Sequence, residues 1–164
     1  MITTSQFHSP LENGAVIRPT DEICMRVWDI VEKNKKENLA RGLICEYTHN
    51  QAFELAGWKF DTTFTTDVYD RAFGGCWQDD KLATYRDGKL STTHTISVAE
   101  MFAWEKQEDV IIHSFEEMPT EDLAYCYRGA ISVRKLQENS LIKSSNFDSG
   151  FWFNRVEAYR HARV

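Results

Sequence analysis

The stretch "SVAEMFAWEKQEDVIIHSF", residues 97–115, is the part of the sequence from which the fold is predicted. Ser97 and Glu100 form the S-x-x-E pattern of a capping box, in which each side chain hydrogen-bonds the backbone of the other residue. The pattern predicts a helix that begins directly after Ser97. The apolar run that follows predicts a buried strand over 110–115.

Working outward from this stretch, further elements are predicted on its N-terminal side. The sequence indicates a strand at 42–48, a brief helix at 49–57, a half-buried strand at 60–69 and a strand at 91–97. Together with the helix and strand of 97–115, this is the element order of a ferredoxin-like split βαβ plait with an antiparallel sheet. We therefore predict the α+β class and that plait.

The remaining segments are predicted as additions to the plait. Residues 1–19 are predicted as an extended N-terminal arm, and 20–164 as a single α+β domain that starts with an extra helix capped by Thr20. Alternating apolar residues in 120–137 favour a strand, whereas the Thr-Glu-Asp run at its start favours a helix, and both remain open. A loop and then a C-terminal strand are predicted over 137–159.

Composition limits the classes of function. The chain has 164 residues, a net charge of −6 and 13% aromatic residues. The acidic balance argues against a nucleic-acid binder, which needs basic surface to replace counterions on phosphates. The sequence lacks an apolar run of membrane-spanning length and a signal-peptide pattern, so no membrane association is expected. Its four cysteines form no CxxC pair, which indicates reduced thiols and a cytoplasmic location.

The abundance of aromatic residues and the N-terminal arm both point to contacts between chains. Aromatic side chains are enriched at protein interfaces, and an extended arm frays unless the body of the domain or another subunit holds it. We therefore expect a homo-oligomer or a protein partner.

The segment "DRAFGGCWQDD", residues 70–80, raises the question of a catalytic thiol. A nucleophilic cysteine needs a lowered pKa. Asp79 and Asp80 lie just beyond Cys76 and would raise its pKa instead. Cys76 is therefore interpreted as a small buried residue in a turn, and the two acids are the better candidates for chemistry.

Two histidines and several acids raise the question of a metal site. His94 and His113, together with Asp67, Glu116 or Glu117, contain the residue types of a two-histidine, one-carboxylate site. No two of these ligands occur at a tight local spacing, and buried histidines with ordinary hydrogen-bond partners are commoner. Neither a metal nor another cofactor is therefore predicted.

One resemblance to a known family extends from Gly75 to Gly129. "GCWQDD", the β-branched strand after it, "AEMFAWEKQEDVII" and "LAYCYRG" are similar in order and spacing to the phage S-adenosylmethionine lyases. The resemblance implies a ferredoxin-like trimer with its site between subunits, no metal and no redox cofactor. It also implies an acidic residue that binds or exchanges protons with S-adenosylmethionine.

The resemblance also implies which residues of this sequence form the site. Asp79, Asp80 and Gln107 are the predicted catalytic residues, and Trp77 and His94 the predicted substrate-binding residues. Two functions are consistent with these features. The first is a non-enzymatic binding or assembly protein that acts as an oligomer, such as a virus-encoded structural component or an inhibitor of a host system. The alternative is an S-adenosylmethionine lyase that destroys the methyl donor of host restriction.

Overall fold

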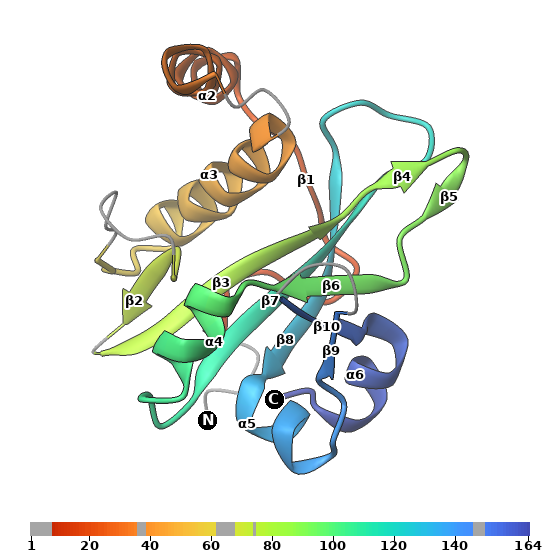
Figure 1. The fold of residues 1–164 in the computed structure, drawn as a ribbon. Helices are drawn as coiled ribbons and strands as arrows, with labels where there is room; N and C mark the ends of the chain where they lie inside the picture. The colour runs from red at the N-terminus through yellow and green to blue at the C-terminus, as the bar shows by residue number, and fades with distance from the viewer. Residues whose placement is uncertain (1–7, 36–38, 62–67, 74, 146–149) are drawn as a thin grey trace.

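The fold combines helices with a central sheet in the computed structural model, which describes residues 8–35, 39–61, 68–73, 75–145 and 150–164 (Figure 1). The helices are α2 (Asp21–Asn34), α3 (Ala40–Leu55), α4 (Val98–Trp104), α5 (Val133–Glu138) and α6 (Arg155–His161). The longer strands are β2 (Arg71–Phe73), β3 (Cys76–Ala83), β6 (Thr93–Ile96), β7 (Val110–Glu117), β8 (Tyr125–Ser132) and β10 (Phe151–Asn154). Two-residue strands are β1 (Val16–Ile17), β4 (Tyr85–Arg86), β5 (Lys89–Leu90) and β9 (Lys143–Ser144). The chain is therefore α+β, as predicted.

The central sheet is mixed. Its five strands lie in the order β1-β8-β7-β3-β2, and β3 pairs with β7 in parallel while the other neighbours are antiparallel. Parallel neighbours need a long crossover, and residues 84–109 supply it with the β4–β5 hairpin, β6 and α4. The predicted antiparallel sheet is therefore wrong at its centre, and the ferredoxin-like plait is not confirmed.

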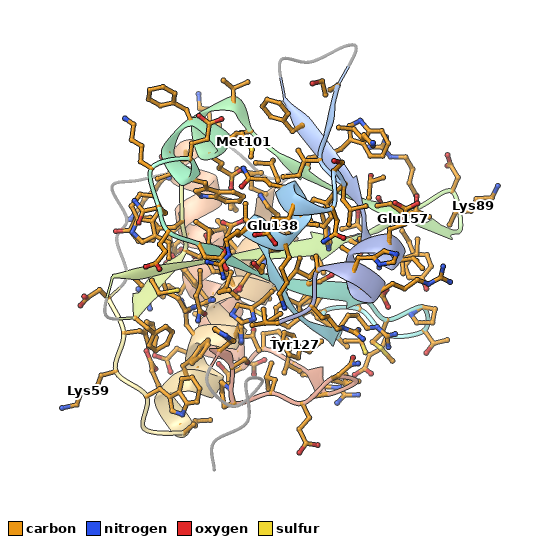
Figure 2. All side chains as sticks on the ribbon, turned by 90° about the horizontal axis from the view of Figure 1, so that it is seen from below. Lys59, Lys89, Met101, Tyr127, Glu138 and Glu157 are labelled. Carbon is orange, nitrogen blue, oxygen red and sulfur yellow. The ribbon has the colours of Figure 1, made fainter. Side chains whose placement is uncertain are left out.

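Each face of the central sheet carries its own apolar layer. On one face, α2 and α3 pack their buried residues, such as Val27 and Ile44, against Phe115 of β7 and Tyr125 of β8. On the other face lie α4, α5, α6 and the small sheet β6-β10-β9, which cover Ile112 and its neighbours. Figure 1 shows α2 at the outer end of the first layer, and Figure 2 shows side chains filling the space on both faces of the sheet.

The two predicted helix caps are confirmed. Thr20 accepts a hydrogen bond from the backbone N–H of Ile23 at the start of α2. At α4, the Ser97 side chain accepts from the Glu100 N–H at 3.0 Å, and the Glu100 carboxylate accepts from the Ser97 N–H at 2.9 Å. Both helices start where these side chains satisfy N–H groups that have no partner within the helix.

The strand predicted at 42–48 is wrong, because these residues belong to the helix α3. The residues that α3 buries against the sheet include Ile44, Thr48 and His49 as well as Phe53. They recur at helical spacing, but two of them are polar, so a hydrophobic pattern alone does not reveal the buried face. The strand prediction therefore fails because the buried face of this helix includes polar side chains, and the hydrogen-bond partners of His49 are distant in the sequence.

Several other boundaries differ from the predictions. Within the predicted strand 60–69, Asp61 forms an isolated bridge to Ala72, and residues 62–67 lie outside the described part of the chain. The open segment 120–137 is β8 followed by α5, and the predicted C-terminal strand is β10, which α6 follows directly. Asn154 caps α6 by accepting a hydrogen bond from the Glu157 N–H.

The arm contacts the body of the domain over its described residues. Val16 and Ile17 form β1 at the edge of the central sheet, and the Gly14 N–H donates to the Tyr127 carbonyl at 2.7 Å. None of the helices in the described ranges is long and apolar enough to span a bilayer. All four cysteines are free thiols.

Candidate functional site

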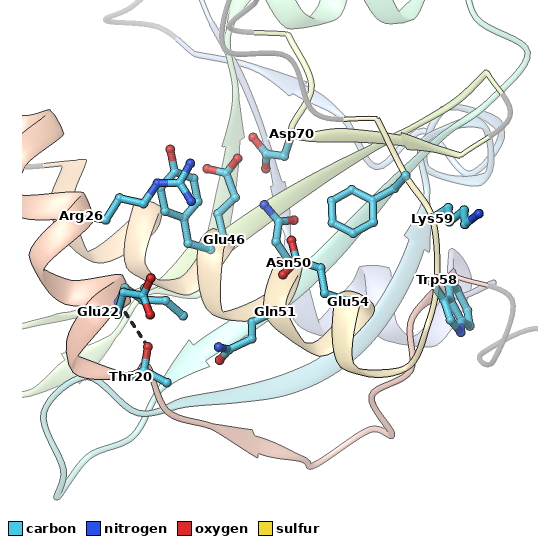
Figure 3. A pocket seen from close by; sticks show the side chains of 13 residues that line it. Thr20, Glu22, Arg26, Glu46, Asn50, Gln51, Glu54, Trp58, Lys59 and Asp70 are labelled. Atoms are coloured by element: carbon cyan, nitrogen blue, oxygen red, sulfur yellow. Dashed lines mark hydrogen bonds between the residues drawn. The ribbon is translucent and has the colours of Figure 1, made fainter.

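A pocket of about 620 Å³ opens between α2, α3 and the segment that follows α3 (Figure 3). Glu22 and Arg26 of α2 lie on one side, and Glu46 and Asn50 of α3 form the floor. Asp70, which directly precedes β2, closes the inner end. The pocket has the size of a small-molecule site.

Two carboxyl groups face one another in this pocket. The side chains of Glu46 and Asp70 point toward each other in Figure 3. Burial, followed by the negative charge of Asp80, raises the pKa of Glu46 to about 8, while a hydrogen bond with Asp70 acts in the opposite direction. Burial and then the charge of Glu46 raise the pKa of Asp70 well above its usual range. The pair therefore retains a proton at neutral pH.

A buried ion pair supports the carboxyl pair from behind. The Arg71 guanidinium donates to both Asp80 oxygens, and its Nε donates to Asn50 Oδ1 at 2.7 Å. His49 lies with Nδ1 3.1 Å from the Asp80 oxygens. The Asp80 N–H in turn donates to Asp70 Oδ2 at 2.6 Å. This backbone contact fixes the position of Asp70 relative to the ion pair.

The electrostatics of this ion pair differ from those of the pocket carboxyls. Burial alone would raise the pKa of Asp80, but Arg71 and then His49 outweigh it, so the pKa lies below its ordinary value. Burial lowers the pKa of His49 even though Asp80 opposes that shift. Asp80 is therefore an ionised carboxylate with a cation beside it, and the shared proton lies with Glu46 and Asp70.

Deeper polar groups tie the arm and β7 to this network. His49 Nε2 accepts from Ser9 Oγ at 2.8 Å. His113 Nε2 donates to Gln78 Oε1 at 2.7 Å, and its Nδ1 accepts from the Tyr127 hydroxyl at 2.8 Å. Burial lowers the pKa of His113 well below its ordinary value, which agrees with a neutral ring in these roles. These groups are satisfied inside the protein and act as its scaffold.

Charged and aromatic side chains line the rest of the pocket. Glu54, Trp58 and Lys59 lie where α3 ends, with Tyr47 and Phe60 also lining the pocket (Figure 3). The Arg26 guanidinium stacks over the Tyr47 ring, 5.1 Å from its centre. The pocket thus joins an acidic inner end to aromatic walls.

The two predicted catalytic acids do not share a site. Asp79 and Asp80 are neighbours on β3, so their side chains point to opposite faces of the sheet. Asp80 lies behind the pocket described above. Asp79 is 3.0 Å from Lys81 Nζ, which also contacts Glu100 of α4. Asp79 therefore belongs to a buried polar cluster on the opposite layer, where burial raises its pKa well above the ordinary value although Lys81 opposes the shift.

The other predicted residues lie in the layer of α4 to α6 or beside it. Trp77 stacks on Tyr69 with ring centres 4.4 Å apart, and His94 Nε2 is 2.7 Å from Ser114 Oγ. Gln107 follows the end of α4, where its N–H donates to the Trp104 carbonyl. The structure does not bring the five predicted site residues together.

The structure also shows the surroundings of Cys76 and of the residues considered as metal ligands. Cys76 starts β3, and burial followed by the charge of Asp109 raises its pKa. The predicted direction is therefore correct, although Asp79 and Asp80 are not its causes. His94 and His113 have separate hydrogen-bond partners, and Asp67 lies outside the described residues. The described part of the chain contains no group of three potential ligands arranged for a metal ion.

Sequence reasoning missed Glu46 and Asp70. Glu46, Asn50 and Glu54 recur at intervals of four, which would place them on one helix face. The strand predicted at 42–48 conceals this spacing, because residues four apart in a strand and the helix after it do not share a helix face. Asp70 precedes a three-residue strand and has no local pattern of its own.

Comparison with other proteins gives no independent assignment of this site. Neither protein-family models, nor curated proteins, nor solved structures match the chain. The resemblance of Gly75–Gly129 to the lyases therefore stays a prediction, and the function has to be argued from the geometry of the site.

Proposed function

We propose that this protein is a binding protein whose ligand is a small organic cation, held in the pocket between α2 and α3. The observation that carries the proposal is the Glu46–Asp70 carboxyl pair at the inner end of a pocket of about 620 Å³. A bound cation would take the place of the shared proton and allow both carboxyl groups to ionise.

Burial of these two carboxyl groups destabilises the folded state when no ligand is bound. Carboxyl groups removed from water without a compensating cation destabilise a protein. Arg71 offsets this cost only in part, through its charge, because it donates its hydrogen bonds to Asp80 and Asn50. Arg26, which also lines the pocket, stacks on Tyr47. Titratable groups with raised pKa values in a pocket are typical of functional sites, which supports a ligand as the missing partner of Glu46 and Asp70.

The walls of the pocket suit a ligand with an apolar or aromatic part. Tyr47, Trp58 and Phe60 line the pocket alongside the acidic residues. Aromatic faces attract cations, and more so where water is excluded. The proposed ligand is therefore an aliphatic or aromatic ammonium or sulfonium compound rather than an anion.

Binding of a simple probe tests the proposal. We expect benzyltrimethylammonium to bind in calorimetry, whereas benzyl alcohol and benzoate, its neutral and anionic counterparts, bind at least tenfold more weakly. Glu46→Gln should weaken binding of the cation at least tenfold, and Glu108→Gln, outside the pocket, should not. Equal binding of the three probes, or unchanged binding by Glu46→Gln and Asp70→Asn, would overturn the proposal.

S-adenosylmethionine cleavage is the second candidate function. The substrate is a sulfonium cation attached to an aromatic base, which is the ligand chemistry inferred for the pocket. In this alternative, Glu46 and Asp70 would replace Asp79 and Gln107 as the residues at the substrate, with Asp80 behind them. Incubation with S-adenosylmethionine should then give methylthioadenosine on chromatography, and Glu46→Gln should abolish it. Product no higher than in a protein-free control excludes the lyase and leaves the binding protein.

A further inference from the structure

The outward face of α2 carries an ordered stripe of exposed side chains. Asp21, Met25, Trp28, Glu32 and Lys35 follow one another at intervals of four, three, four and three residues, and all five are exposed. Met25 is 71% exposed and Trp28 50% exposed, both high values for large apolar residues. Alternating intervals of three and four place the first four along one side of α2, as in helix pairs that pack lengthwise. Lys35 follows as the C-cap, in the left-handed conformation, at the same end of the helix as Glu32.

This stripe lies apart from the rest of the domain. Val27 and Val31 face the core, and Glu22, Ile23 and Arg26 face the pocket. At about 100° per residue, the stripe is a third side of the same helix. In Figure 1, α2 lies at the outer end of its layer. The exposure of Met25 and Trp28 shows that the described residues leave this side of the helix uncovered.

The charges of the stripe are arranged for a second copy of itself. The N-terminal end of α2 is acidic at Asp21 and Glu22, and the exposed centre is apolar. The C-terminal end carries Glu32 but is basic overall, with Lys33 and Lys35. Asp21 and Lys35 are each seven residues from Trp28. Rotation of α2 by a two-fold axis at Trp28 would therefore bring Asp21 of each copy opposite Lys35 of the other. The antiparallel arrangement also opposes the two helix dipoles favourably.

We propose that two copies of this chain associate through an antiparallel α2–α2 contact centred on Trp28. The two-fold symmetric contact uses the same surface of both copies. It pairs Asp21 with Lys35 at both ends and covers Met25 and Trp28 in the middle, with Glu32 lying between Trp28 and Lys35 of its own copy. Within the described residues neither Asp21 nor Lys35 forms an ion pair, so both are available for this contact. The pocket faces another side of α2 and stays open in the dimer.

The contact is small, which sets the expected affinity. A pair of 14-residue helices that meet along one stripe lies at the low end of interface sizes, typical of transient association. The dimer should therefore be reversible, with a dissociation constant in the micromolar range. Sedimentation velocity between 5 and 200 µM of the full chain covers this range.

A charge exchange provides the decisive experiment. Asp21→Lys places two lysines opposite each other at both ends, and Lys35→Asp does the same with two acids. Each variant alone should raise the dissociation constant at least tenfold. An equimolar mixture of the two should dimerise again, because each end then joins opposite charges. Glu108→Lys, with the same change of charge as Asp21→Lys but far from α2, should dimerise like the unmodified chain.

The same measurements can overturn the proposal. Circular dichroism of each variant shows whether the chain remains folded, and Lys35→Asp provides the test if Asp21→Lys weakens the start of the helix. An unmodified chain that is monomeric at 200 µM, a dimer insensitive to both substitutions, or a mixture that does not dimerise would each refute the α2 contact. These outcomes do not depend on ligand binding in the pocket.

Discussion

Replacement of Glu46 by glutamine should stabilise the protein in alkaline solution while it removes the ligand site. The carboxyl of Glu46 has its pKa raised from 4.5 to about 8 in the folded chain. When the pKa of a carboxyl group is higher in the folded chain than in the unfolded chain, its contribution to stability is complete below the pKa of the unfolded chain. That contribution is lost as the pH rises through the pKa of the folded chain. Between pH 4.5 and 8 the folded state therefore becomes progressively less stable because of this one group. Glutamine has no proton to lose and avoids that loss.

The magnitude follows from the pKa and the surroundings of Glu46. A rise from 4.5 to about 8 corresponds to at most about 5 kcal/mol, at about 1.36 kcal/mol for each pH unit. Because the side chain is partly open to the water of the pocket, screening reduces the expected gain to about 2 kcal/mol. Loss of the neighbouring charge also eases ionisation of Asp70, which acts in the same direction.

Urea unfolding at pH 5, 7 and 9 measures this effect. The free energies of unfolding of Glu46→Gln and the unmodified chain should be similar at pH 5 and differ by about 2 kcal/mol in favour of the variant at pH 9. Glu54→Gln is the matched control, because Glu54 lies two turns further along α3 and is exposed. A variant that is less stable at pH 9, or a difference that does not change with pH, would refute the reasoning.

Two further substitutions test the scaffold. Arg71→Met leaves the buried carboxylate of Asp80 without its cation and should cost about 3–5 kcal/mol at pH 7 in urea unfolding. The loss should shrink as pH falls below 5, because burial raises the pKa of Asp80 once Arg71 no longer outweighs it; a deficit that grows in acid would contradict the ion pair. Ser97→Ala removes the cap of α4 and should cost about 1 kcal/mol, whereas Ser97→Thr keeps the hydroxyl and most of the stability. An alanine variant as stable as the original would show that the cap is dispensable.

Local chemistry was sufficient to predict some elements of the fold. The start of α4 follows from two side chains three residues apart, and the start of α2 follows from Thr20 and the acidic residues after it. The buried strand at 110–115 follows from an uninterrupted apolar run and forms the centre of β7. In each case the determining interactions are close in sequence, or the burial is so complete that pattern alone reveals it.

The parallel pairing of β3 with β7 could not be predicted in this way. It depends on where a crossover of residues 84–109 returns the chain to the sheet. Hairpin turns fix an antiparallel partner locally, whereas a long connection leaves the choice of neighbour to the packing of the whole domain. The helix α3 escaped prediction for a related reason, since the sheet and the arm supply the partners of its buried Thr48 and His49.

Asp80, predicted as a catalytic residue, affects the pocket without lining it. Its side chain is 3% exposed and bound by Arg71, so it does not itself offer a carboxylate to a ligand. It acts on the pocket instead through its charge, which raises the pKa of both Glu46 and Asp70, and through its N–H, which holds Asp70. Arg71 partly offsets that charge, since it lowers the pKa of the same two carboxyls. The ion pair thus sets how readily the pocket gives up its proton, and the negative charge of Asp80 would attract a cation that takes the place of that proton.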